Sequence, residues 1–165
     1  MSLYFAYGSN MVRAQMAARC PRARLIGPAS LPDHRFAIIR SGHGTILRKR
    51  GDLLWGVLWR LGRGDEAALD RYEEIARGLY RRGRCVVQRG GRAVPALVYV
   101  AAATARGTAR PAYLDAIVAA ARRCGFPAGY VAALAALRSA SARTSSGDLP
   151  LSLSELKVSA RSRLA

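Results

Sequence analysis

The sequence lacks any apolar run long enough to cross a lipid bilayer. The two longest candidates, residues 94–103 and 128–137, fall short of the roughly 18 residues that a membrane helix needs. The amino-terminal apolar residues have no basic segment before them and are interrupted at Gly8, so a secretory signal is not expected. These features predict a cytoplasmic protein without a membrane partner.

Cysteine and histidine are also scarce. Cys20, Cys85 and Cys124 are odd in number and far apart, which argues against a disulfide framework and against a Cys-x-x-Cys metal site. The two histidines, His34 and His43, have no further ligands at metal-binding spacing. We therefore expect reduced cysteines and no metal.

Acidic residues are few, 10 against 27 basic residues, which gives a net charge of +17. A charge of this size is typical of proteins that bind nucleic acids. However, only Lys49 and Lys157 are lysines, and both arginine and the abundant alanine have G/C-rich codons, so compositional drift is a competing explanation. The arginines extend from Arg13 to Arg163 without a dense basic block, which favours drift. A basic nucleic-acid-binding module remains the main alternative from another functional class.

Length and composition fit one globular domain. The chain has 165 residues, of which 51% are hydrophobic, enough for a single core. We predict one domain over residues 1–140. Residues 141–165 are polar and serine-rich, and we expect this tail to be either docked on the domain or disordered.

The order of predicted elements indicates an α+β fold. Strands do not alternate with helices throughout, so a doubly wound sheet is excluded, and a small mixed β-barrel with flanking helices is expected. Asn10 is predicted to cap the first helix. The expected strands are residues 3–7, 24–30, 35–39, 44–48, 53–61, 79–88 and 93–100; the expected helices follow residue 10 and cover 65–75, 111–124 and 127–138.

The loop Tyr7-Gly8-Ser9-Asn10 connects the first strand to the first helix. Glycine lets the backbone approach a ligand closely, and the free N–H groups at a helix start form a site for an anion such as a carboxylate. On these residues alone, an ordinary tight turn with an asparagine cap is the more common explanation.

A helix rich in acidic residues supplies a candidate acid–base group. Helical spacing places Glu73 on one face with Leu69, Tyr72 and Ala76, so Glu73 is expected to point inward. Burial of a carboxylate raises its pKa towards the range used in general acid–base catalysis. Glu74 falls on the arginine-rich side, where an ion pair in water is expected. The alternative for Glu73 is a partly exposed residue that pairs with an arginine.

Three segments together resemble the γ-glutamylcyclotransferases. YFAYGSNM at residues 4–11 resembles their opening motif, and WGVLW at residues 55–59 resembles one of their strands. LDRYE at residues 69–73, followed by GLYRR at residues 78–82, resembles the segment with their catalytic glutamate. The order and spacing agree over roughly residues 3–117.

The resemblance implies a barrel whose rim pocket cyclises a γ-glutamyl group to 5-oxoproline and releases an amino acid or amine. It implies no cofactor or metal, a small-molecule partner only, and a monomer or homodimer. Glu73 is then the general acid–base residue. The substrate-binding residues that it implies are Tyr7, Gly8, Ser9, Asn10, Tyr99 and Tyr113.

The sequence departs from the family pattern after the glutamate, where glycine is usual and Glu74 stands here. A second carboxylate could raise the pKa of Glu73 or change the leaving group that is accepted. The glutathione-degrading branch usually has leucine where Asn10 stands, so glutathione itself is not the expected substrate. A catalytically silent relative that only binds γ-glutamyl ligands is a further alternative.

Overall fold

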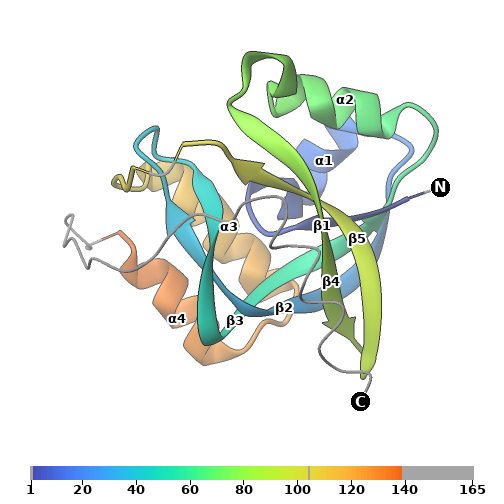
Figure 1. Cartoon of the computed structure of the whole chain (residues 1–165). Coiled ribbons are helices and arrows are strands. Elements are labelled where there is room, and N and C mark those ends of the chain that lie inside the picture. The colour runs from blue at the N-terminus through green and yellow to red at the C-terminus, as the bar shows by residue number, and fades with distance from the viewer. Residues whose placement is uncertain (1, 104, 139–165) are drawn as a thin grey trace.

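The computed structural model describes residues 2–103 and 105–138 of the chain. Five strands and four α-helices, with two short 3₁₀ turns, make up this part (Figure 1). The strands are β1 (Leu3–Ala6), β2 (Arg24–Ile38), β3 (Gly44–Arg60), β4 (Tyr80–Arg89) and β5 (Arg92–Ala101). The helices are α1 (Arg13–Arg19), α2 (Asp65–Tyr72), α3 (Pro111–Arg123) and α4 (Ala128–Ala136), and the 3₁₀ turns are η1 (Ser9–Met11) and η2 (Ile75–Arg77). The predicted tail, residues 141–165, lies outside the described residues.

The strands form a closed barrel in the order β1-β3-β2-β4-β5. All neighbouring pairs are antiparallel except β1 and β5, which pair in parallel at Tyr4 and Leu97. The predicted mixed barrel with flanking helices is therefore confirmed. The predicted strands 79–88 and 93–100 correspond to β4 and β5, which a tight hairpin joins: Gly90 and Gly91 both have positive φ between the paired Arg89 and Arg92.

The prediction of four separate strands between residues 24 and 61 is wrong. These residues form two long strands, β2 and β3, which pair along almost their whole length. Pro32-Asp33, between the predicted strands 24–30 and 35–39, lies at a register shift of this ladder, with Asp33 at φ 59°. The Asp33 carboxylate accepts a hydrogen bond from the Gly51 N–H at 2.9 Å, so the two turn-like segments face each other as an irregularity within the sheet.

The helices lie in two pairs around the barrel. Figure 1 shows α1 and α2 together over one end, while α3 and α4 lie against a different side. The predicted helices over residues 111–124 and 127–138 correspond to α3 and α4. None of the helices in the described ranges is long and apolar enough to cross a membrane.

The first helix does not begin where the sequence predicted. Asn10 lies inside η1, and α1 starts only at Arg13, after Val12 as its amino-terminal cap. The Asn10 side chain is 3% exposed and bonds to the interior of the molecule instead of capping a helix. The expected capping role of Asn10 is therefore wrong.

The core fills the barrel and continues beneath the helices. Phe5, Leu58 and Met16 are fully buried or nearly so, as is Ile117 of α3. Burial of apolar surface on this scale is the main stabilising contribution to such a fold. The three cysteines, all within the described ranges, are unpaired.

Candidate active site

A pocket of about 590 Å³ opens where the β1–η1 loop, the end of α2, β5 and the start of α3 meet. It collects side chains that are far apart in the sequence. All seven residues that the sequence analysis proposed for the site line it: Tyr7, Gly8, Ser9, Asn10, Glu73, Tyr99 and Tyr113. The structure thus brings these residues together around one space that can hold a small molecule.

The loop after β1 forms one wall of the pocket. Gly8 has an ordinary negative φ of −118°, so its role is not a left-handed turn. A side chain at this position would bring its first carbon within 3.0 Å of the Tyr113 hydroxyl. Glycine therefore allows the loop backbone and Tyr113 to lie together at the pocket.

Glu73 lies at the point where α2 ends. Its N–H still donates to the Leu69 carbonyl at 2.8 Å, but the helix stops at Tyr72 and Glu74 turns left-handed at φ 50°. The inward position of Glu73 is confirmed, since its side chain lines the pocket. The rest of the predicted face is only partly correct, because Leu69 is buried whereas Tyr72 and Ala76 are exposed.

The Glu73 carboxylate is shielded from water and held by one amide group. Asn10 Nδ2 donates a hydrogen bond to Glu73 Oε1 at 3.0 Å. Burial raises the pKa of Glu73 from its ordinary value of 4.5 to about 7, and the positive charge of Arg19 and the Asn10 hydrogen bond oppose this rise. A group with this pKa can both accept and donate a proton at neutral pH.

Arg19 sets the orientation of the Asn10 amide and was missed by the sequence analysis. Its Nη1 donates to Asn10 Oδ1, so the amide nitrogen is the end that faces Glu73. Its Nη2 donates to the Tyr72 hydroxyl at 2.6 Å, and the guanidinium lies 3.5 Å from the centre of the Tyr72 ring. In a sequence with so many arginines, nothing distinguishes Arg19 before the fold is known.

Glu74 differs from Glu73 in its surroundings. It also lines the pocket, but its carboxylate forms an ion pair with Arg77 of η2, whose side chain is largely exposed. The predicted pairing of Glu74 with an arginine in water is confirmed. Such an exposed pair contributes little to stability.

Tyrosines form much of the remaining wall, and three of them, Tyr4, Tyr72 and Tyr80, were not predicted as site residues. The Tyr80 hydroxyl donates to the Gly44 carbonyl, and the Gly44 N–H donates to the Tyr113 hydroxyl, both at 2.8 Å. Burial raises the pKa of the Tyr4, Tyr80 and Tyr113 hydroxyls well above the ordinary value, so they stay protonated. These side chains supply neutral hydrogen-bonding groups around the partly buried carboxylate of Glu73.

A metal centre is not suggested by the side chains present. Within residues 2–103 and 105–138, no three side chains of histidine, cysteine, aspartate or glutamate are grouped so that they could hold a metal ion. The chemistry that the described pocket offers is proton transfer and hydrogen bonding.

Comparison with known proteins supports the resemblance seen in the motifs. The model of the AIG2-like family matches residues 53–134. The gamma-glutamylcyclotransferases of Bos taurus and Homo sapiens are each 33% identical over 88 residues, which cover 47% of this chain and 47% of each relative. The chain thus spans about half the length of the curated relatives it matches.

Solved structures match a larger part of the chain. An uncharacterized protein from Homo sapiens superposes with a TM-score of 0.78 at 26% identity, over 88% of this chain and 94% of that one. A structure described as a gamma-glutamyl cyclotransferase also has a TM-score of 0.78, at 24% identity, over 96% of this chain and 98% of the other, and shows the same fold. The resemblance to γ-glutamylcyclotransferases and the barrel fold that it implied are confirmed.

Proposed function

We propose, from the resemblance of this chain to the γ-glutamylcyclotransferases, that it cyclises a γ-glutamyl-amino acid or a γ-glutamyl-amine to 5-oxoproline. The observation that carries the proposal is the position of Glu73, a shielded carboxylate with a pKa raised to about 7, in a pocket shared with the Tyr7–Asn10 loop. A single group of this kind meets the needs of a reaction that moves protons, one at a time, from the attacking nitrogen to the leaving nitrogen.

The proposed reaction begins with the α-ammonium group of the substrate. Glu73 takes one of its protons, and the freed amine attacks the γ-carbonyl carbon to form the new C–N bond of a five-membered ring. The resulting tetrahedral intermediate then collapses, the bond to the original amide nitrogen breaks, and Glu73 returns the first proton to that leaving nitrogen. The ionised Glu73 then takes the second proton from the ring nitrogen and passes it to the released amine, which departs as an ammonium ion. The products are 5-oxoproline and a free amine, and no oxidant, reductant or water is consumed.

Most of the acceleration is expected from holding the substrate in a folded conformation. Amine and carbonyl belong to the same molecule, and intramolecular attack in a well-oriented geometry corresponds to an effective concentration of ~10⁵ M or more. Proton transfer by Glu73 is expected to contribute ~10²- to 10⁴-fold in rate. The pocket of about 590 Å³ has room for such a folded γ-glutamyl group.

Hydrogen-bond donors at the loop are proposed to bind the substrate oxygens. Ser9, Asn10 and Tyr113 all line the pocket, and Gly8, beside Ser9, lies close to the Tyr113 hydroxyl, so we propose the Ser9 and Asn10 N–H groups and this hydroxyl as the donors. They can hold the α-carboxylate or the oxygen that becomes negative in the intermediate. Loss of one donor to such an oxyanion costs about 3 kcal/mol in other acyl-transfer sites.

The proposal is tested by incubating the protein with a panel of γ-glutamyl-amino acids and γ-glutamyl-amines and measuring 5-oxoproline. Glu73→Gln is expected to reduce kcat by ~10²-fold or more, because the amide cannot take up the proton. Glu74→Gln is the matched control, one residue away, and is expected to retain activity. No 5-oxoproline from any substrate, or equal activity in Glu73→Gln, would contradict the proposal.

A further inference from the structure

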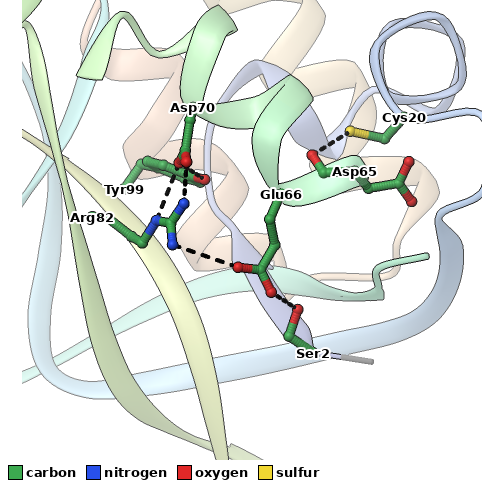
Figure 2. Close-up of polar contacts among 7 residues, drawn as sticks. All are labelled: Ser2, Cys20, Asp65, Glu66, Asp70, Arg82 and Tyr99. Atoms are coloured by element: carbon green, nitrogen blue, oxygen red, sulfur yellow. Dashed lines mark hydrogen bonds and ion pairs between the residues drawn. The ribbon is translucent and has the colours of Figure 1, made fainter. Parts of the chain in front are cut away.

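Asp70 lies outside the pocket lining but contacts a residue within it. The Tyr99 hydroxyl donates a hydrogen bond to Asp70 Oδ1 at 2.7 Å, from β5 to α2 (Figure 2). Tyr99 is 2% exposed and lines the same pocket as Glu73. Asp70 thus determines where the proton of this buried hydroxyl points.

The tyrosine hydroxyls around the pocket fall into two groups. Tyr7 donates its proton to the Tyr99 carbonyl at 2.6 Å, and Tyr80 and Tyr99 donate theirs to Gly44 and Asp70. A hydroxyl has one proton, so these three can offer only oxygen lone pairs to a ligand.

Three other hydroxyls have the opposite arrangement. Tyr4 accepts a hydrogen bond from Asn10 Nδ2 at 2.8 Å, Tyr113 accepts one from the Gly44 N–H at 2.8 Å, and Tyr72 accepts one from Arg19 at 2.6 Å. Each therefore keeps its own proton to donate to a second partner. The pocket combines groups that favour an ammonium ion with groups that favour carboxylate or carbonyl oxygens.

Two of the three proton acceptors of the first group are backbone carbonyls, of Tyr99 and Gly44, and the third, Asp70, is a side chain. Arg82 of β4 holds Asp70 through a hydrogen bond from Nε at 3.1 Å and an ion pair through Nη2. Arg82 also lies 3.6 Å from Glu66 Oε2, and Glu66 in turn accepts a hydrogen bond from the Ser2 hydroxyl. Figure 2 shows this chain of contacts linking the start of β1, α2, β4 and β5.

We propose that Asp70 is a positioning residue. By accepting the hydrogen bond of the Tyr99 hydroxyl, it leaves the Tyr99 oxygen free to act only as an acceptor, for the α-ammonium group of the γ-glutamyl substrate. This inference rests on the proposed function. An ammonium group has three donors and no acceptor, so it is the substrate group that matches an oxygen without a free proton. Hydrogen bonds that involve a charged group are the stronger class, which makes this contact a determinant of binding.

The position of Tyr99 agrees with this assignment. Its ring meets the Tyr4 ring edge-on with centres 5.7 Å apart, and the Tyr4 hydroxyl shares the Asn10 amide nitrogen with Glu73. Tyr99 is therefore linked to the base through Tyr4 and Asn10, and all four residues line the same pocket. The amine must be there, since Glu73 has to remove its proton.

The test measures how much of the binding depends on the amine. Asp70→Ala is introduced into the Glu73→Gln protein, which is expected to bind the ligand without cyclising it, and dissociation constants are measured by calorimetry. The probes are γ-glutamyl-L-alanine and N-glutaryl-L-alanine, which differ only in the α-amino group. Asp70→Ala is expected to raise the dissociation constant of γ-glutamyl-L-alanine about tenfold and that of N-glutaryl-L-alanine by less than about twofold.

Two further variants separate this role from a merely structural one. Tyr99→Phe is expected to give the same selective loss, and Asp70→Ala is expected to add nothing in the Tyr99→Phe background. Asp115→Ala, which breaks the exposed ion pair of α3 with Arg138 away from the Asp70 contacts, is expected to leave both constants unchanged. Equal weakening of the two probes by Asp70→Ala, or no loss for the amine-bearing probe, overturns the inference.

The two proposals fail in different ways. If the unsubstituted protein makes 5-oxoproline but Asp70→Ala weakens both probes alike, the role of Asp70 is wrong and the proposed function stands. If no γ-glutamyl compound binds or reacts, the proposed function is wrong and the role of Asp70 falls with it.

Discussion

Asn10 Nδ2 lies 3.0 Å from Glu73 Oε1, although the two residues are 63 positions apart in the sequence. The same amide nitrogen donates to the Tyr4 hydroxyl, and the amide oxygen accepts from Arg19. The backbone carbonyl of Asn10 also accepts a hydrogen bond from Trp59 Nε1 at 3.0 Å. One asparagine thus joins the loop, α1 and β3 to the carboxylate proposed as the base.

The pKa of Glu73 predicts the pH dependence of the reaction. If the ionised carboxylate is the base, kcat/KM rises with pH as Glu73 loses its proton, with a midpoint near the pKa of about 7. The measurement is the initial rate of 5-oxoproline formation at low substrate concentration between pH 5 and 9. A rising limb with a midpoint near 4.5 would show that Glu73 is not shielded in the working enzyme.

The same shift predicts how stability changes with pH. Glu73 binds its proton more tightly in the folded state, with a pKa of about 7, than in the unfolded state, where it is near the ordinary 4.5. The unfolded state therefore holds fewer protons between these values, and the free energy of unfolding falls as pH rises from about 4.5 to 7, by on the order of 1–3 kcal/mol.

Urea unfolding of the unsubstituted protein and of Glu73→Gln across this pH range checks that decline. The glutamine cannot titrate, whereas all other groups titrate in both proteins. The difference between the two curves should therefore widen in favour of Glu73→Gln as pH increases. A constant difference would mean that the pKa of Glu73 does not change on folding.

Removal of the Asn10 amide should alter both the pKa and the activity. In Asn10→Ala, Glu73 loses a hydrogen bond that lowers its pKa, so the rising limb of kcat/KM should move to higher pH. At pH 7, kcat/KM should fall about tenfold or more, as expected for loss of a hydrogen bond to a charged group. Gln15→Ala is the control, because Gln15 also binds Arg19, at 2.9 Å. Equal profiles for Asn10→Ala and the control would contradict the role of Asn10.

Gly44 is predicted to be intolerant of any side chain. An added methyl group would come within 2.5 Å of the Phe36 ring and 2.8 Å of the Tyr113 hydroxyl. Gly44→Ala should therefore lower the free energy of unfolding by about 1–3 kcal/mol and raise KM, because Tyr113 is displaced. Thermal unfolding and substrate titration measure the two effects.

The matched control for this change is Gly129→Ala in α4. An added methyl group there meets nothing within 4 Å, and alanine favours the helix by about 1 kcal/mol. This variant should be slightly more stable and equally active. Loss of stability in both variants to the same degree would show that the crowding around Gly44 is not the cause.

The parts of the site that could be predicted from sequence are those that depend on local pattern. The end of an apolar strand at Gly8 located the loop, and the three-to-four-residue spacing of α2 placed Glu73 beside buried Leu69. The capping role of Asn10 was wrong, because the partners that bury its side chain, Tyr4 and Glu73, come from β1 and α2. No local pattern reports such distant partners.

The remaining parts depend on pairing across the barrel. Asp33 and Gly51 each resemble turn residues, and only their mutual hydrogen bond shows that the strands continue past them. Likewise, Arg82 and Asp70 lie 12 positions apart on different elements, and their contact follows from how α2 packs over β4. Long-range register of this kind is set by the whole hydrophobic pattern of the sheet and not by the residues at the contact.

The hydrogen bonds that orient Tyr4, Tyr7 and Tyr99 are made to partners within the protein, and these three side chains are no more than 6% exposed. Their rotamers are therefore already restricted before any ligand arrives. Association with a ligand then loses little side-chain conformational entropy from the protein, so more of the contact energy is retained as affinity. Side chains that are already fixed in this way cannot adapt to a ligand of a different shape. Such ligands are therefore expected to bind weakly.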